Sequence, residues 1–322
     1  MRTLSTLLCL LIGFQQSGAP GDQSEGQTQQ MVAVVRDARG ELVRHLRPGD
    51  FVLEEDGVPQ PISRFEEDSN IPVSLGILID VSTSMTARSG GMSRLSAAQG
   101  TVRMLLRMMK PGDQFLLMSF ATGISVNQDF TEDPRLIETS LNKLTTSPVT
   151  NLFAAVESAL QKMKKAKHRT RALVLISDGI AGGDLKSLSR NIVDSETLIY
   201  TFCLLDKQAA DVTQPVIGVS GRPGFPVQAP QMTSTPNQIL NTLASDSGGN
   251  SEIFDVADLD AAILQMVKFD QNIVAEMRGQ YTVEYVSKTS GGPAGHSIRL
   301  KVTSPDYKLR ARRNTASAAK PQ

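Results

Sequence analysis

The chain has 322 residues, of which 40% are hydrophobic and 20% are charged, so it can bury a sizeable core and is expected to be globular rather than disordered. Its 33 basic and 33 acidic residues give a formal net charge of zero. Because no global field would attract a polyanion, the composition argues against nucleic acid or an anionic membrane as the partner.

The first residues predict an export signal. Arg2 precedes an apolar stretch at 4–14, and small residues at 17–19 form a plausible cleavage site. That stretch is too short to span a bilayer, and no later segment reaches the required apolar length. We therefore expect a signal peptide at 1–19, a polar spacer at 20–30, and a soluble mature protein, periplasmic or secreted, without a transmembrane anchor.

Residues 31–70 predict a small N-terminal β segment. A weakly alternating strand at 31–35 is followed by turn residues, and a second strand leads into Asp56-Gly57, which is a strong hairpin signal. Residues 60–65 are expected to return as the partner of that second strand.

From residue 71 to residue 277 apolar strands alternate with amphipathic helices. The expected strands are apolar on both faces and lie at 73–81, 114–120, 171–177, 197–205 and 251–256. Apolar residues at helical spacing predict long helices near 95–109, 151–163 and 259–277. This alternation predicts an α/β fold with a doubly wound, mostly parallel sheet flanked by helices.

The stretch 207–236 is rich in proline and glycine and predicts an irregular loop. A loop of this length either takes part in function, here by shaping the approach of a partner, or is a mobile excursion without a role. Just before it, Cys203 lies inside an apolar run. Because no second cysteine would remain after export, we expect Cys203 to be a core residue rather than a nucleophile.

Oxygen-bearing side chains follow two of the expected strands. Asp80 ends the first strand, with Ser82 and Ser84 spaced by two behind it, and Asp178 follows the third. In open α/β sheets, ligands bind outside the carboxyl ends of the strands. Thr150 could add a further hydroxyl at the start of a helix, where it would otherwise simply cap that helix. Carboxylates and hydroxyls of this kind suit a hard cation such as Mg²⁺.

These residues together resemble the von Willebrand factor type A family and its metal-ion-dependent adhesion site. The motif of that family is Asp-x-Ser-x-Ser, a distant Thr and a distant Asp-Gly, and it is matched by Asp80, Ser82, Ser84, Thr150 and Asp178. The resemblance implies a Rossmann-like fold and a bound Mg²⁺, with Mn²⁺ or Ca²⁺ as alternatives. It also implies a protein partner that offers an Asp or Glu carboxylate. Ordinary roles in turns or as a helix cap would explain each of these residues singly, but not why all of them occur together in the order of the motif.

The flanking segments are similar to the bacterial, Acidobacteria-type branch of exported proteins in this family. Residues 32–57 resemble its N-terminal β segment, and 280–285 with 298–302 resemble its C-terminal hairpin. The resemblance implies a C-terminal β segment at 278–313, with a polar tail at 314–322. Relatives tend to close with Gly-Tyr after the last basic strand, and this chain does not.

Binding without turnover is the function that the resemblance implies, so we expect an exported, metal-dependent adhesion-type module and not an enzyme. A hydrolase is the remote alternative, because Ser82 and Ser84 lie outside a Gly-x-Ser-x-Gly elbow and the sequence has no zinc-protease or phosphate-loop motif. A second alternative is a structural scaffold of the cell envelope whose metal site is empty or merely stabilising. Its support is the two β flanks, which could pair with each other or offer edges to another chain.

Overall fold

A computed structural model describes residues 27–68, 71–89, 91–148, 151–179, 185–205, 235–287 and 296–314. The expected signal peptide, most of the spacer, Thr150, loop residues 207–234 and tail residues 315–322 lie outside these ranges.

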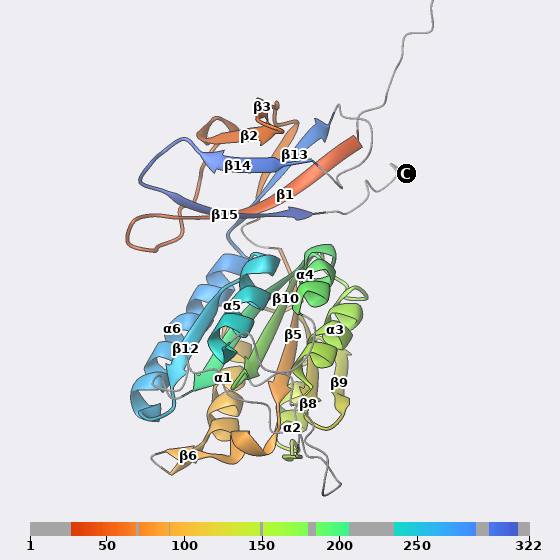
Figure 1. The fold of residues 1–322 in the computed structure, drawn as a ribbon, viewed down its shortest axis with the longest axis vertical. Helices are drawn as coiled ribbons and strands as arrows, with labels where there is room; N and C mark the ends of the chain where they lie inside the picture. Colours follow the sequence, from red (N-terminus) through yellow and green to blue (C-terminus); the bar gives the residue numbers. More distant parts are fainter. Residues whose placement is uncertain are drawn as a thin grey trace, which may run out of the picture.

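The lower part of the molecule is an α/β layer built on one central sheet (Figure 1). In the described residues this sheet has six strands in the order β12-β11-β10-β5-β8-β9. Their bounds are β5 Val73–Asp80, β8 Gln114–Phe120, β9 Ile124–Thr131, β10 Thr170–Ser177, β11 Thr197–Leu205 and β12 Ser251–Asp255. All neighbouring pairs are parallel except β8 with β9, which is antiparallel. The predicted fold class is therefore confirmed.

Helices cover both faces of this sheet. Their bounds are α1 Arg94–Met108, α2 Pro134–Leu141, α3 Leu152–Met163, α4 Leu185–Asp194, α5 Pro236–Ser247 and α6 Leu259–Met277. One core cluster packs α1, α2 and α6 against the sheet, and a second packs α3, α4 and α5 against the opposite face. Short elements occur at η1 Pro48–Asp50, η2 Thr83–Thr86, β6 Arg88–Ser89 and β7 Met92–Ser93. None of the helices described is long and apolar enough to cross a bilayer.

The start of α5 corrects the predicted end of the proline-rich loop. Pro236 is the first residue of this helix, whereas the sequence analysis placed it in irregular structure. Thr235 caps the helix by accepting a hydrogen bond from the backbone of Gln238, whose side chain in turn accepts one from the Thr235 backbone. Proline is favoured at a first helical position because its missing N–H would have no partner there.

The upper part of the molecule is a β layer formed by both flanks of the α/β layer (Figure 1). One sheet has the order β15-β1-β13-β4, with bounds Lys308–Asn314, Gln27–Arg36, Gln280–Ser287 and Arg64–Asp68. The other has the order β14-β2-β3, with bounds Ile298–Val302, Phe51–Glu55 and Val58–Pro59. The two sheets share a core that includes Phe51, Leu53, Tyr281 and Tyr285. The N- and C-terminal flanks thus form the predicted β appendage together.

The predicted hairpin at Asp56-Gly57 forms, but its predicted return strand is wrong, and so is the predicted C-terminal hairpin. The return strand after β2 is only Val58–Pro59, because positive φ angles at Asp56 and Gly57 turn the chain back at once. The segment that was expected to return, 60–65, instead leads into β4, which pairs with β13. At the other end of the chain, β14 pairs with β2 rather than with β13.

Charged residues join the two layers. Glu276, at the end of α6, is buried and accepts hydrogen bonds from Arg36 of β1 at 3.1 and 2.5 Å. It also pairs with Arg310 of β15. In addition, Arg44 donates a hydrogen bond to the Arg278 carbonyl at 2.7 Å. The end of α6 is therefore attached to the β layer by buried and partly buried charged contacts.

Candidate functional site

Asp80 lies at the carboxyl end of β5, at the edge of the sheet that faces away from the β layer (Figure 1). Its side chain is fully buried. One carboxylate oxygen accepts a hydrogen bond from the Ser82 backbone at 2.8 Å, and the other accepts one from the Ser177 hydroxyl at 2.7 Å. The Ser177 hydroxyl itself accepts from the Gly179 N–H at 2.9 Å. The ends of the neighbouring strands β5 and β10 are thereby tied together.

Ser82 and Ser84 lie beside this carboxylate at the start of η2. Ser82 is extended and almost fully buried, and its hydroxyl lies 2.9 Å from that of Ser84. Met85 is buried beneath them and anchors the turn in the core. The spacing of two residues therefore brings both hydroxyls to one side, as the sequence predicts.

Asp178 follows β10 and is also fully buried. Its carboxylate lies 3.3 Å from the guanidinium of Arg94, the first residue of α1. Burial, together with the nearby Asp178 carboxylate, raises the pKa of Asp80 to about 6, although hydrogen bonds from Ser82 and Ser177 oppose the shift. The site thus concentrates negative charge in a region shielded from water.

The backbone conformation and the close packing at position 179 explain why a glycine follows Asp178. The φ of Gly179 is +75°, and an added Cβ would lie 2.9 Å from the Cβ of Pro236 and 3.0 Å from the Pro236 carbonyl oxygen. A side chain at this position would therefore be strained and would also push against the start of α5.

The structure brings four of the five predicted site residues, Asp80, Ser82, Ser84 and Asp178, to the same edge of the sheet, while Thr150 lies outside the described residues. The chain shortly before Thr150 passes close by, since the Ser147 N–H donates to the Val81 carbonyl at 2.9 Å. Just after Thr150, Asn151 is the N-cap of α3, and its side chain accepts a hydrogen bond from the Ala154 backbone at 3.4 Å.

Sequence reasoning missed two residues of this region, Arg94 and Ser177. Arg94 carried a usable signal: a cation in the first turn of a helix is disfavoured by the helix dipole, so it needs a compensating anion. Ser177 carried a weaker signal, since it is a polar residue at the end of a buried strand.

The carboxylate and hydroxyl oxygens at this edge of the sheet suit a hard divalent cation as ligands. In the part of the chain that the structure describes, His, Cys, Asp and Glu form no group of three that could hold a metal. A cation here would depend on hydroxyl oxygens as well as carboxylates, and Asp80, Ser82 and Ser84 present such oxygens together. An all-oxygen set suits Mg²⁺, Mn²⁺ or Ca²⁺ rather than softer metals.

Cys203 lies in the middle of the second core cluster and is fully buried. Burial raises the pKa of its thiol to about 12; the Asp178 carboxylate adds to the shift and Arg94 opposes it. The thiol is therefore protonated at neutral pH, and the prediction that Cys203 is a core residue is confirmed.

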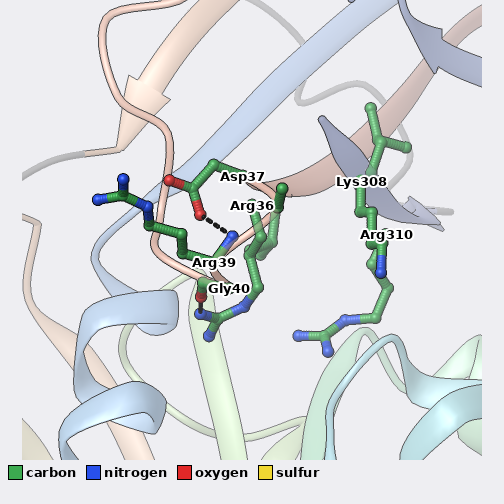
Figure 2. A pocket seen from close by; sticks show the side chains of 9 residues that line it. Arg36, Asp37, Arg39, Gly40, Lys308 and Arg310 are labelled. Carbon is green, nitrogen blue, oxygen red and sulfur yellow. Dashed lines mark hydrogen bonds between the residues drawn. The ribbon is translucent and has the colours of Figure 1, made fainter. Parts of the chain in front are cut away.

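A hollow of about 380 Å³ lies in the β layer between the turn after β1 and the start of β15. Figure 2 shows the basic side chains that line it, Arg36, Arg39, Lys308 and Arg310. The turn is held by Asp37, whose carboxylate accepts from the Arg39 backbone at 2.9 Å. Arg36 and Arg310 pair with Glu276, so part of this positive charge attaches the β layer to α6.

Comparisons with known proteins bear on the α/β layer. Residues 75–180 match the sequence profile of the von Willebrand factor type A domain. No curated protein matches the chain.

Three of the similar solved structures are bacterial proteins. An aerotolerance-related membrane protein of Bacteroides fragilis is 20% identical, with a TM-score of 0.44 over 61% of this chain and 98% of that one. The conserved hypothetical protein BatB of Bacteroides thetaiotaomicron is 18% identical, with a TM-score of 0.48 over 63% and 99%. A von Willebrand factor type A protein of Catenulispora acidiphila is 11% identical, with a TM-score of 0.47 over 89% and 73%. On the profile match to residues 75–180, the chain contains a von Willebrand factor type A domain.

Proposed function

We propose that this chain is an exported protein-binding module in which a divalent cation, held by Asp80, Ser82, Ser84, Thr150 and Asp178, binds a carboxylate of a partner protein. The observation that carries the proposal is the buried cluster of carboxylate and hydroxyl oxygens at the carboxyl edge of the sheet. Export rests on the leader-like residues 1–19.

The charges of the site support the binding of an anion by the occupied centre. Asp80 and Asp178 carry two formal negative charges, and Arg94 carries one positive charge. A divalent cation changes the formal sum of these groups from −1 to +1, so an incoming carboxylate meets a net positive site. The cation would supply electrostatic attraction and an open coordination position, and Ser82 and Ser84 would orient it.

Binding rather than turnover is favoured because the serines lack a base. Ser82 and Ser84 hydrogen-bond to each other. The three histidines of the described residues lie elsewhere: the His45 ring is 3.5 Å from Glu67, the His168 ring contacts the Gly112 carbonyl at 2.9 Å, and the His296 ring contacts Asp56 at 2.6 Å. A hydrolytic serine would need a base within hydrogen-bond reach.

Calorimetric titration of the purified chain with Mg²⁺ tests the site. We expect saturable binding by the wild type and none by Asp80→Ala. Asp129→Ala is the matched control, because Asp129 is an exposed aspartate that pairs with Lys162 far from this motif in the sequence. Equal Mg²⁺ binding by the wild type and Asp80→Ala would rule out the proposed centre.

A second titration tests the anion. Once Mg²⁺ is bound, a glutamate-containing peptide should bind with an affinity that disappears on chelation. Peptide binding that is unchanged by chelation would contradict the coordination mechanism, while the Mg²⁺ site itself could stand.

A further inference from the structure

A cavity of about 150 Å³ lies between α1 and α6, and none of the proposed metal ligands lines it. Its walls are mostly small or apolar: Ala97, Gly100 and Met104 come from α1, and Ile263 and Met266 come from α6. The polar residues of the lining are Ser96 and Thr101 on α1 and the acid Asp270 on α6. The cavity therefore combines an apolar interior with one acid.

Asp270 is fully buried, and neither of its carboxyl oxygens has a hydrogen-bond partner. Buried polar groups are normally satisfied, and a buried carboxyl without partners is costly in either protonation state. The Thr101 hydroxyl, which also lines the cavity, donates to the Met266 sulfur at 3.2 Å and not to Asp270. A ligand that donates hydrogen bonds would remove this cost.

The position of Asp270 follows from helix geometry. Ile263, Met266 and Asp270 are separated by three and four residues, so they share one face of α6, and that face packs against α1. Opposite them, Gly100 leaves open space: a Cβ built at this residue would meet no atom within 4 Å. The absence of a side chain at Gly100 thus leaves part of the cavity wall on α1 open.

We propose that this cavity binds an alkylammonium ion. Its alkyl chain would lie between Met104 and Met266, and its nitrogen would contact the carboxyl group of Asp270. An ammonium donates three hydrogen bonds and supplies the missing positive charge, while its methylenes match the apolar walls. A lone carboxylate among apolar side chains does not suit Mg²⁺, which requires several oxygen ligands. A cavity of about 150 Å³ holds a molecule the size of benzene, so four carbons and a nitrogen fit.

Protonation of the acid links binding to pH. Burial raises the pKa of Asp270 to about 8, and Asp270 is the only titratable side chain among the residues that line the cavity. Below that pH the bound ammonium must displace a proton from the carboxyl group. The affinity is therefore expected to increase from pH 6 to pH 8.

Titration with n-butylammonium, followed by ligand-observed NMR at pH 8, tests the proposal on the full chain. We expect saturable binding that is at least tenfold weaker for Asp270→Asn, which keeps the shape of the side chain but cannot ionise. 1-Butanol, which is similar in size but uncharged, should also bind at least tenfold more weakly. Equal binding by the wild type and Asp270→Asn, or no saturable binding by the wild type, would overturn the proposal.

A second variant blocks the space without touching the acid. Gly100→Leu places a side chain in the open region and should reduce butylammonium binding at least tenfold. Unchanged binding would mean that the amine binds elsewhere, which also overturns the proposal. Far-ultraviolet circular dichroism of each variant verifies that it is folded.

A lysine peptide as a further ligand distinguishes whether the ammonium group belongs to a lysine of a partner protein or to a free alkylamine. Met92 in β7 and Ser96 in the first turn of α1 are exposed, so the cavity can be reached from that end. A peptide Gly-Gly-Lys-Gly-Gly that binds at least tenfold more tightly than butylammonium would assign the site to a lysine of a partner protein. A peptide that binds no more tightly would assign it to a free alkylamine.

Discussion

The junction between the two layers and the region around α1 both bury carboxyl groups, but the two regions satisfy them to different degrees. At the junction, Asp113 is buried and accepts hydrogen bonds from the backbone N–H groups of Val73 at 2.9 Å and Lys110 at 2.7 Å. It also pairs with Arg278, which is itself almost fully buried. Protein groups alone neutralise this acid.

Around α1 the acids depend on fewer protein cations. Arg94 lies near Asp178, while the pKa of Asp80 is raised by burial and by Asp178. Asp270, which faces α1 across the cavity, has no hydrogen-bond partner for its carboxyl oxygens. The comparison shows that protein groups fully satisfy the buried acid at the junction, whereas the α1 region contains buried acids that protein cations and hydrogen bonds satisfy only in part.

The largest expected effect is at the junction. Asp113→Ala should lower the free energy of unfolding by about 3–5 kcal/mol, because it leaves the Arg278 charge buried without its carboxylate. Urea unfolding measures the loss. Asp129→Ala, which breaks an ion pair of an exposed aspartate, should cost under about 1 kcal/mol. Similar losses for the two variants would show that the buried Asp113–Arg278 pair stabilises the junction no more than an exposed ion pair does.

The next effect is a pH dependence at Asp270. The folded protein keeps the proton on this acid up to about pH 8, whereas the unfolded chain loses it near the ordinary value of 3.8. The contribution of Asp270 to stability is therefore complete below about pH 4 and is lost as the pH rises towards 8, by about 1.4 kcal/mol for each pH unit.

The control is Asp270→Asn, because an asparagine cannot ionise and the pH-dependent contribution of this residue to stability is therefore lost. From pH 5 to pH 7, the stability of the variant relative to the wild type should increase by about 3 kcal/mol, measured by urea unfolding at both pH values. A difference that stays constant over this range would mean that Asp270 is ionised in the folded state, with a partner that neutralises it.

Much of the α/β layer could be predicted because fully buried strands have a local signature. The apolar runs at 114–120 and 197–205 coincide with β8 and β11, since a strand buried on both faces is apolar throughout. The pairing of β14 with β2 could not be predicted in this way. It joins Leu300 to Leu53, and contacts so distant in the sequence leave no local pattern.

In the candidate site, too, the features with a local sequence pattern could be predicted, and those that depend on distant contacts could not. Asp80, Ser82 and Ser84 form a local motif after a recognisable strand, so their convergence could be predicted. The position of Arg94 next to Asp178 could not, because it depends on how α1 packs against the end of β10. Its effect on the charge of the site is therefore a finding of the structure alone.

The smallest of these effects is expected for Arg94→Gln. Its Mg²⁺ affinity distinguishes between two roles of Arg94. If Arg94 mainly competes with the cation for Asp178, Arg94→Gln should increase the Mg²⁺ affinity about fivefold, equivalent to about 1 kcal/mol, because a like charge has been removed. Arg107→Gln, at the exposed end of the same helix, should change the affinity less, since it removes the same charge at a greater distance. A lower affinity in Arg94→Gln alone would show instead that Arg94 orients Asp178, so that the guanidinium supports the site rather than opposing the cation.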